Sequence, residues 1–160
     1  MSKIKTNPSP KIKHLKLNPL SVAKFFWEKG VEDMALMQRI LYLLSLETII
    51  KENTLLFEEE WQAWPHGPAV KSVFDKMHDS RYELDKLFAP VKDLDHELAL
   101  NFANKTFKKY HKTEPYLIFE KAQNKPWKDA RKPLKSESQI AKISLASLVK
   151  FANGKARITA

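Results

Sequence analysis

The five histidines are the first residues to consider for chemistry, because a histidine side chain can act as a general base or bind a metal. They are His14, His66, His78, His96 and His111. No two of them are three or four residues apart, and no HExxH motif occurs, so the sequence does not predict a zinc site on a helix. His66 lies beside Trp64 and a Gly-Pro pair. Without a recognisable nucleophile, it favours a structural role or contact with a partner over catalysis.

An acidic triplet, Glu58, Glu59 and Glu60, is the second candidate, because adjacent carboxylates can bind a cation or share a proton. Neighbouring side chains of an extended segment point to opposite faces, so only Glu58 and Glu60 would align. This pattern is more typical of a solvated edge. The chain has no cysteine and three scattered glycines, which excludes thiol chemistry and a glycine-rich phosphate loop. We therefore expect no catalytic activity, no bound metal and no cofactor.

The third candidate is a basic and aromatic run at residues 101–112, NFANKTFKKYHK. Its lysines are Lys105, Lys108, Lys109 and Lys112, and its rings are Phe102, Phe107 and Tyr110. Lysines bind phosphates and rings stack on bases, so the run suits nucleic-acid binding. On a helix, however, the rings would share one face and the lysines would occupy the other. We favour a core face with a solvated lysine face, the four lysines being candidate contacts for a partner.

The net charge of +9 is unevenly distributed along the chain. Residues 1–18 contain five lysines and no acid, residues 19–100 contain 9 basic and 15 acidic side chains, and residues 101–160 contain 14 basic and 4 acidic side chains. Such asymmetry indicates a dipolar surface or a basic face for an acidic partner, either nucleic acid or protein. The absence of cysteine, of a signal-like apolar run and of a membrane-length apolar segment leads us to expect a cytoplasmic protein.

The elements that position these residues are mostly helices, because few glycines and a helical spacing of apolar residues favour a bundle. We expect helices from Pro19 to Gly30, from Met34 to Asn53, from Pro68 through Met77, from Asp95 through Tyr110, from Thr113 through Ala122, and from Ser136 to Asn153-Gly154. Residues 54–64 are expected to be a short extended segment or hairpin, residues 79–94 irregular, and residues 124–134 a loop. The helix from Met34 is apolar on nearly every face, which predicts a central position.

The fold class is therefore mainly α, a compact single-domain bundle of about six helices within residues 18–153. Residues 1–17 contain two prolines and a lysine every few positions, so we expect them to form a flexible basic tail. Residues 154–160 are expected to be a short C-terminal tail after the last helix.

Two stretches carry a more specific signal. The first combines the central helix with the segment LLFEEEWQAWPHGPAV, and the second is LIFEKAQNKPW, which ends at Trp127. The residues that match are Leu36, Leu41, Tyr42, Phe57, Glu60, Ala63, Trp64, Gly67, Pro68, Val70, Pro126 and Trp127. In type and order they resemble the Panacea domain, the SocA-like family of antitoxin and phage-associated proteins. We expect these residues to be structural.

This resemblance implies a helical domain that neutralises a cognate toxin, encoded beside it, by direct stoichiometric protein binding. It also implies an alternative, an adaptor that presents its partner to a protease. The basic C-terminal third leaves a third possibility open, a nucleic-acid-binding module, although the sequence contains no recognisable DNA-recognition helix. An enzyme is the reading with the least support.

Overall fold

The structure, a computed structural model, describes residues 11–159. In this range the mainly α class is confirmed, with eight helices where about six were expected. The helices are α1 (Pro19–Glu28), α2 (Met34–Glu52), α3 (Lys71–Asp79), α4 (Leu84–Phe88), α5 (Glu97–Tyr110), α6 (Pro115–Ala122), α7 (Lys125–Arg131) and α8 (Leu145–Thr159). The strands are β1 (Lys13–His14), β2 (Thr54–Leu55), β3 (Trp61–Trp64), β4 (Gly67–Ala69) and β5 (Ala141–Ile143).

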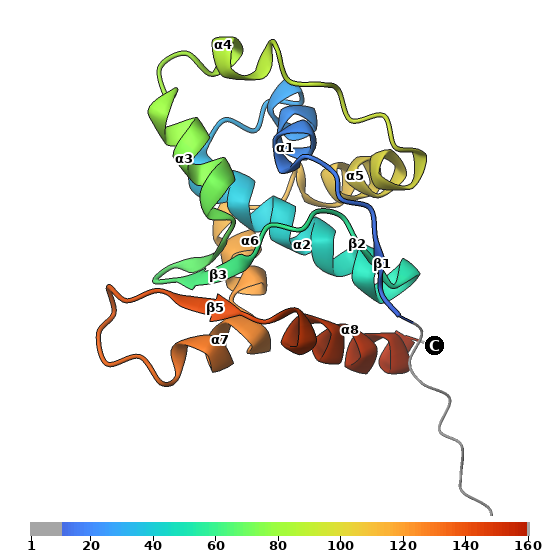
Figure 1. Ribbon diagram of the computed structural model, residues 1–160, viewed down its shortest axis with the longest axis vertical. Helices are drawn as coiled ribbons and strands as arrows, with labels where there is room; N and C mark the ends of the chain where they lie inside the picture. The colour runs from blue at the N-terminus through green and yellow to red at the C-terminus, as the bar shows by residue number, and fades with distance from the viewer. Residues whose placement is uncertain (1–10, 160) are drawn as a thin grey trace, which may run out of the picture.

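Helix α2 crosses the middle of the molecule, with α1, α3 and α5 on one side and α7 and α8 on the other (Figure 1). The Asp33 side chain caps its start by accepting a hydrogen bond from the Leu36 backbone nitrogen at 2.7 Å. Asn53 ends it in the left-handed conformation, with φ of 47°. These are the ends expected from the capping preferences of Asp and Asn.

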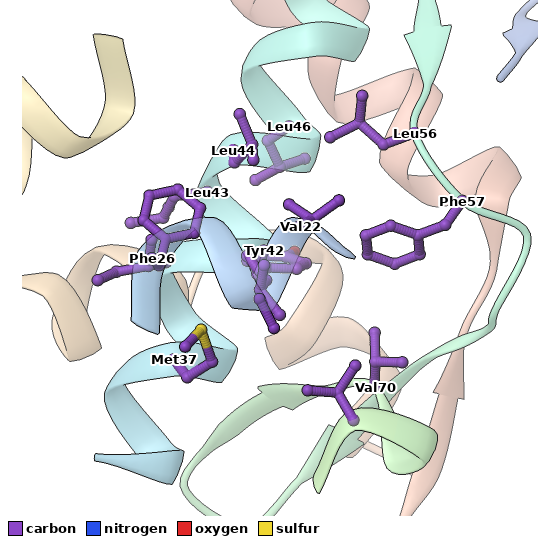
Figure 2. Close-up of a cluster of buried hydrophobic side chains, with 14 of the residues drawn as sticks. Val22, Phe26, Met37, Tyr42, Leu43, Leu44, Leu46, Leu56, Phe57 and Val70 are labelled. Carbon is purple, nitrogen blue, oxygen red and sulfur yellow. The ribbon is translucent and has the colours of Figure 1, made fainter. Parts of the chain in front are cut away.

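The core forms around α2 because its apolar side chains point in every direction. Leu41 and Leu44 are fully buried, and Val22 and Phe26 of α1 pack against the same cluster (Figure 2). Phe57, from the segment between β2 and β3, covers another side of the cluster (Figure 2). A helix enclosed in this way gains most of its stability from tertiary packing rather than from helix propensity.

Two small sheets lie beside the helices. In the first, β1 pairs with β2 in parallel. In the second, the order is β4-β3-β5 and both pairings are antiparallel. The short extended segment or hairpin expected near residues 54–64 corresponds to β2 and β3, and the hairpin itself is formed by β3 and β4, whose second strand lies after that range. Pro68, expected to begin a helix, lies instead in β4, an edge strand, where a residue without an N–H group is tolerated. Helix α3 begins only at Lys71.

The N-terminal segment differs from the expected flexible tail. Residues 1–10 lie outside the described range, but from residue 11 the chain packs along β2. The backbone nitrogens of Lys13, Leu15 and Leu17 donate hydrogen bonds to carbonyl oxygens at 2.9, 3.0 and 2.8 Å. The half-buried side chains of Leu15 and Leu17 pack on the core. Here backbone pairing and the packing of two leucines order the segment, although the neighbouring lysines remain exposed.

The last third also differs from expectation. Residues 124–134, expected to be a loop, contain α7, so Pro126 and Trp127 lie in the first turn of a helix. Residues 136–140 are not helical; β5 follows them and α8 begins at Leu145. Helix α8 then continues through Gly154 to Thr159, where a tail was expected. Nothing in Gly154 forces a helix to stop, because a helical glycine only lowers its stability modestly.

Smaller differences concern the middle of the chain. Residues 79–94, expected to be irregular, contain the short helix α4. Helix α5 is capped by the His96 side chain rather than by Asp95. Helix α6 starts at Pro115 after Glu114, without a capping bond from Thr113.

Candidate functional site

The segment with the strongest sequence signal folds as a tight hairpin. Strands β3 and β4 are joined by Pro65 and His66, and Trp64 lies opposite Gly67. His66 is exposed at the tip. With so few residues in the hairpin, most of its backbone carbonyls must find partners outside it.

Two polar side chains of α2 bind the backbone of β4 and of Val70, the residue that follows it. The amide of Gln38 accepts a hydrogen bond from the Val70 nitrogen at 2.7 Å and donates one to the Val70 oxygen at 3.2 Å. The guanidinium of Arg39 donates to the Pro68 oxygen at 2.9 Å. Both side chains are buried, 2% and 5% exposed respectively, so these bonds are shielded from water.

Gly67 is required by this arrangement. Its φ of 150° is a conformation that residues with a side chain rarely adopt, and a Cβ atom there would lie 2.4 Å from Nε of Arg39. Glycine therefore permits both the backbone turn and the close approach of the guanidinium.

Side chains from the end of α6 and from α7 bind the outer part of the hairpin. The Gln123 amide donates to the His66 oxygen at 2.9 Å, and the Trp127 indole donates to the Trp64 oxygen at 2.9 Å. Arg131 donates to the Ala63 oxygen at 2.8 Å. Four hairpin carbonyls, those of Ala63, Trp64, His66 and Pro68, and that of Val70 directly after β4 are thus bound by side chains. The two sequence stretches that resemble one family meet here.

The charge of Arg39 is costly in this position. Burial lowers the pKa of its guanidinium to about 10 from an ordinary 12.5, and the charge of Asp33 opposes that shift. Its Nε atom has no hydrogen-bond partner within residues 11–159. The guanidinium lies over the ring of Phe119, 5.5 Å from its centroid, which partly compensates the loss of water. The Arg39 side chain thus extends from α2 and is held between the hairpin and α6.

Tyr42 connects α2 with the segment between α6 and α7. Its hydroxyl donates to Oδ1 of Asn124 at 2.8 Å. Burial raises the pKa of this phenol, and the hydrogen bond to Asn124 acts in the opposite direction. Its ring packs edge-on against Trp61 at 5.1 Å. Tyr42 is thus part of the internal framework.

The remaining motif residues differ in how far they are buried. Leu41, Phe57, Ala63, Val70 and Pro126 are buried, and Leu36 is half-buried against the core. Trp64 and Trp127 are only half-buried. Glu60 is exposed and pairs with Lys142 of β5 at 3.3 Å, while Glu58 pairs with His14 at 3.1 Å. The acidic triplet thus lies at a solvated edge, with Glu60 in an ion pair with Lys142 and Glu58 in hydrogen-bond contact with His14.

The candidate lysines lie on a different part of the molecule from His66. In Figure 1, α5 lies on the right of the molecule and β3 of the hairpin on the left. Lys105, Lys108, Lys109 and Lys112 are all exposed, while Phe102, Thr106 and Tyr110 are buried on the other face of the helix. The structure therefore brings the motif residues together but does not join His66 and the lysines into one site.

The polar side chains that hold the hairpin were not recognised from the sequence. They are Gln38, Arg39, Gln123 and Arg131. A usable signal existed for the first two, because a Gln-Arg pair interrupts the apolar N-terminal half of α2. The others come from a segment that looks like an ordinary polar loop.

Among residues 11–159, no group of three or more His, Asp or Glu side chains is placed to bind a metal ion. Within the same range, no helix has the length and apolar character needed to cross a bilayer.

These features define a class of protein, a helical domain whose characteristic sequence motif clamps a hairpin onto its central helix. Residues 37–144 match the family described as "Antitoxin SocA-like, Panacea domain". The match covers more than half of the chain, and the chain belongs to this family. No curated protein and no solved structure matches it.

Proposed function

We propose that this chain is the antitoxin of a toxin–antitoxin system and neutralises a cognate protein toxin by direct, stoichiometric binding. The observation that carries the proposal is the family match over residues 37–144. This range includes the hairpin, α3 to α7 and nearly all of α2. The partner is a protein encoded next to this chain, and binding blocks the toxin by occupancy.

The contacts that hold the hairpin support a binding role. The hairpin and the residue after it form backbone hydrogen bonds with the side chains of Gln38, Arg39 and Trp127. A fold held by internal contacts of this kind leaves its exposed helix faces free to change without unfolding. Such a scaffold suits a protein that must match a specific partner surface.

The test is a growth-rescue series with the product of the neighbouring reading frame. We expect a complex of fixed composition on size-exclusion chromatography, and growth restored only as the molar ratio of this chain to the toxin approaches one. Rescue at a small fraction of that ratio would indicate an enzyme that removes the toxin's product. Rescue accompanied by a fall in toxin abundance, and lost in a protease-deficient strain, would indicate an adaptor for proteolysis.

A nucleic-acid-binding module is the competing function, favoured by the exposed lysines of α5 and by Lys112 just after it. Binding to nonspecific duplex DNA, measured over a salt series, tests it separately. Several phosphate contacts would make affinity fall steeply with salt concentration. Tight, salt-sensitive DNA binding together with no protein complex would overturn the antitoxin proposal.

A further inference from the structure

A surface groove lies over the C-terminal half of α2, between α5 and α6 on one side and α8 on the other. Its floor is formed by Leu43, Leu46 and Ile50 of α2, and its walls include Tyr110 of α5 and Phe151 of α8. This hollow has a volume of about 390 Å³. A second hollow of about 330 Å³, over Phe102 and Thr106, shares Glu47 and Lys51 with it. We call the two together the α5–α8 groove.

Lysines surround this apolar floor. Those that line it are Lys51, Lys105, Lys109, Lys121 and Lys155, against the carboxylates of Glu47 and Glu52. Lys51, Lys105, Lys109 and Lys121 take part in none of the ion pairs found within residues 11–159. The groove therefore has an excess of positive charge, because four of its lysines form no ion pair within residues 11–159.

Aromatic rings hold several of these ammonium groups at the rim. Lys105 lies over Phe102 at 5.2 Å, and Lys109 and Lys121 both lie over Tyr110, at 5.4 and 5.2 Å. Cation–π contacts orient an ammonium group while leaving its charge available to an anion. The result is an apolar floor with positive charges placed along its edges.

This combination fits one kind of occupant better than others. An amphipathic helix lays apolar side chains into a groove and presents its flanking residues to the rim. Carboxylates on those flanks would meet the lysines, whereas Leu43, Leu46 and Ile50 offer nothing to a phosphate backbone. Glu47 and Glu52 would repel a continuous row of phosphates but can be avoided by spaced carboxylates.

We propose that the α5–α8 groove binds an acidic amphipathic segment of the partner protein, with apolar side chains on the α2 floor and carboxylates at the lysine rim. The identity of the partner as a toxin rests on the proposed function, whereas the chemistry of the segment rests on the groove. Of the four candidate lysines, Lys105 and Lys109 of α5 line the groove, whereas Lys108 of α5 and Lys112, just after the helix, are not among its described lining residues.

That division supplies a matched pair of variants. The test variant combines Lys105→Glu with Lys109→Glu, and the control combines Lys108→Glu with Lys112→Glu. Both pairs are exposed, lie four residues apart and change the net charge equally. Affinity for the neighbouring gene product should fall about tenfold or more in the test variant, mainly through slower association, and by less than about threefold in the control. Equal losses, or none in either variant, would overturn the groove proposal.

A second probe separates the groove from the toxin. It is a fluorescein-labelled synthetic helix with leucines at i, i+4 and i+7 and glutamates on both flanks, compared with a scrambled peptide of the same composition. We expect the ordered helix to bind more tightly, and the test variant to lose this preference while the control keeps it. If the neighbouring gene product forms no complex but this selectivity holds, the groove stands and the antitoxin role fails. If both peptides bind alike, the groove proposal fails.

Discussion

The β3–β4 hairpin and the α5–α8 groove use their polar groups in opposite ways. At the hairpin, Gln38 and Arg39 are buried and their hydrogen bonds close on the protein's own backbone. At the groove, Lys105 and Lys109 are exposed and rest on rings. The family motif lies in the first region and the uncompensated charge in the second. The difference teaches that the most recognisable residues of this chain hold the fold, while the residues that we propose for partner binding lie elsewhere.

The largest expected effect concerns the shared base of both regions, α2. Leu41→Ala removes a fully buried side chain and should lower the free energy of unfolding by about 2–5 kcal/mol, because it leaves a cavity that the core cannot fill. Leu117→Ala on α6, where the leucine is 44% exposed, is the control and should cost less than about 0.5 kcal/mol. Urea unfolding measures both. Similar losses would mean that α2 is not the enclosed centre.

A second substitution tests the hairpin itself. Gly67→Ala places a methyl group against Arg39 in a backbone conformation that alanine rarely adopts, so we expect a loss of about 2–4 kcal/mol. Gly154→Ala is the matched change in α8, where nothing lies within 4 Å of the added carbon, and it should be neutral or stabilise by up to about 1 kcal/mol. Thermal melting compares them. A tolerant Gly67 would show that the guanidinium can move away.

Truncation tests how far the rigid part extends toward the N-terminus. Deleting residues 1–16 removes the backbone hydrogen bonds donated by Lys13 and Leu15 and the packing of Leu15. Relative to a chain that lacks only residues 1–10, it should lose about 2 kcal/mol, because each bond contributes about 1 kcal/mol net. Equal unfolding midpoints for the two truncated chains would return residues 11–16 to the role of a dispensable tail.

The smallest expected effect lies where the two regions meet, because Asn124 both accepts from Tyr42 and lines the groove. Tyr42→Phe should cost about 1 kcal/mol at pH 7. Burial raises the pKa of Tyr42, so above pH 10 the unfolded phenol releases its proton first and wild-type stability falls as pH rises.

The Y42F variant lacks that contribution, so its deficit should shrink between pH 7 and pH 11. Tyr82→Phe is the control, because this tyrosine is 87% exposed, and its stability should track the wild type at both values. A deficit for Y42F that stays constant with pH would contradict the burial of the phenol. Chemical denaturation at the two pH values measures these differences.

Local sequence preferences were sufficient for the long helices α2 and α5, although not for α8. Asp33 and Asn53 mark the ends of α2, and its all-round apolar composition predicted its central position. The two faces of α5 also followed from spacing alone, since Phe102 and Tyr110 are buried and Lys105 and Lys108 exposed. In such segments each residue's preference agrees with its neighbours over several turns, which makes the pattern readable.

Short elements were not readable in the same way. The three residues of β5 form a strand only because β3 offers a free edge beside them. Similarly, α7 has seven residues, too few for a periodic signal, and it is stabilised by what Trp127 and Arg131 bind on the hairpin. Leu15 and Leu17 were hidden among lysines, and pairing with the chain after α2 decided their place.

The sequence by itself determined the mainly α class, the position of α2, the presence of a hairpin and the family to which the chain belongs, because these depend on residue type and spacing within continuous stretches. Only the tertiary structure decided that Gln38 and Arg39 hold the hairpin, and that Lys105 and Lys109 line a groove while Lys108 and Lys112 do not. The physical reason is that such assignments depend on which distant segments meet, and a lysine's own neighbours in the chain do not reveal what lies across from it.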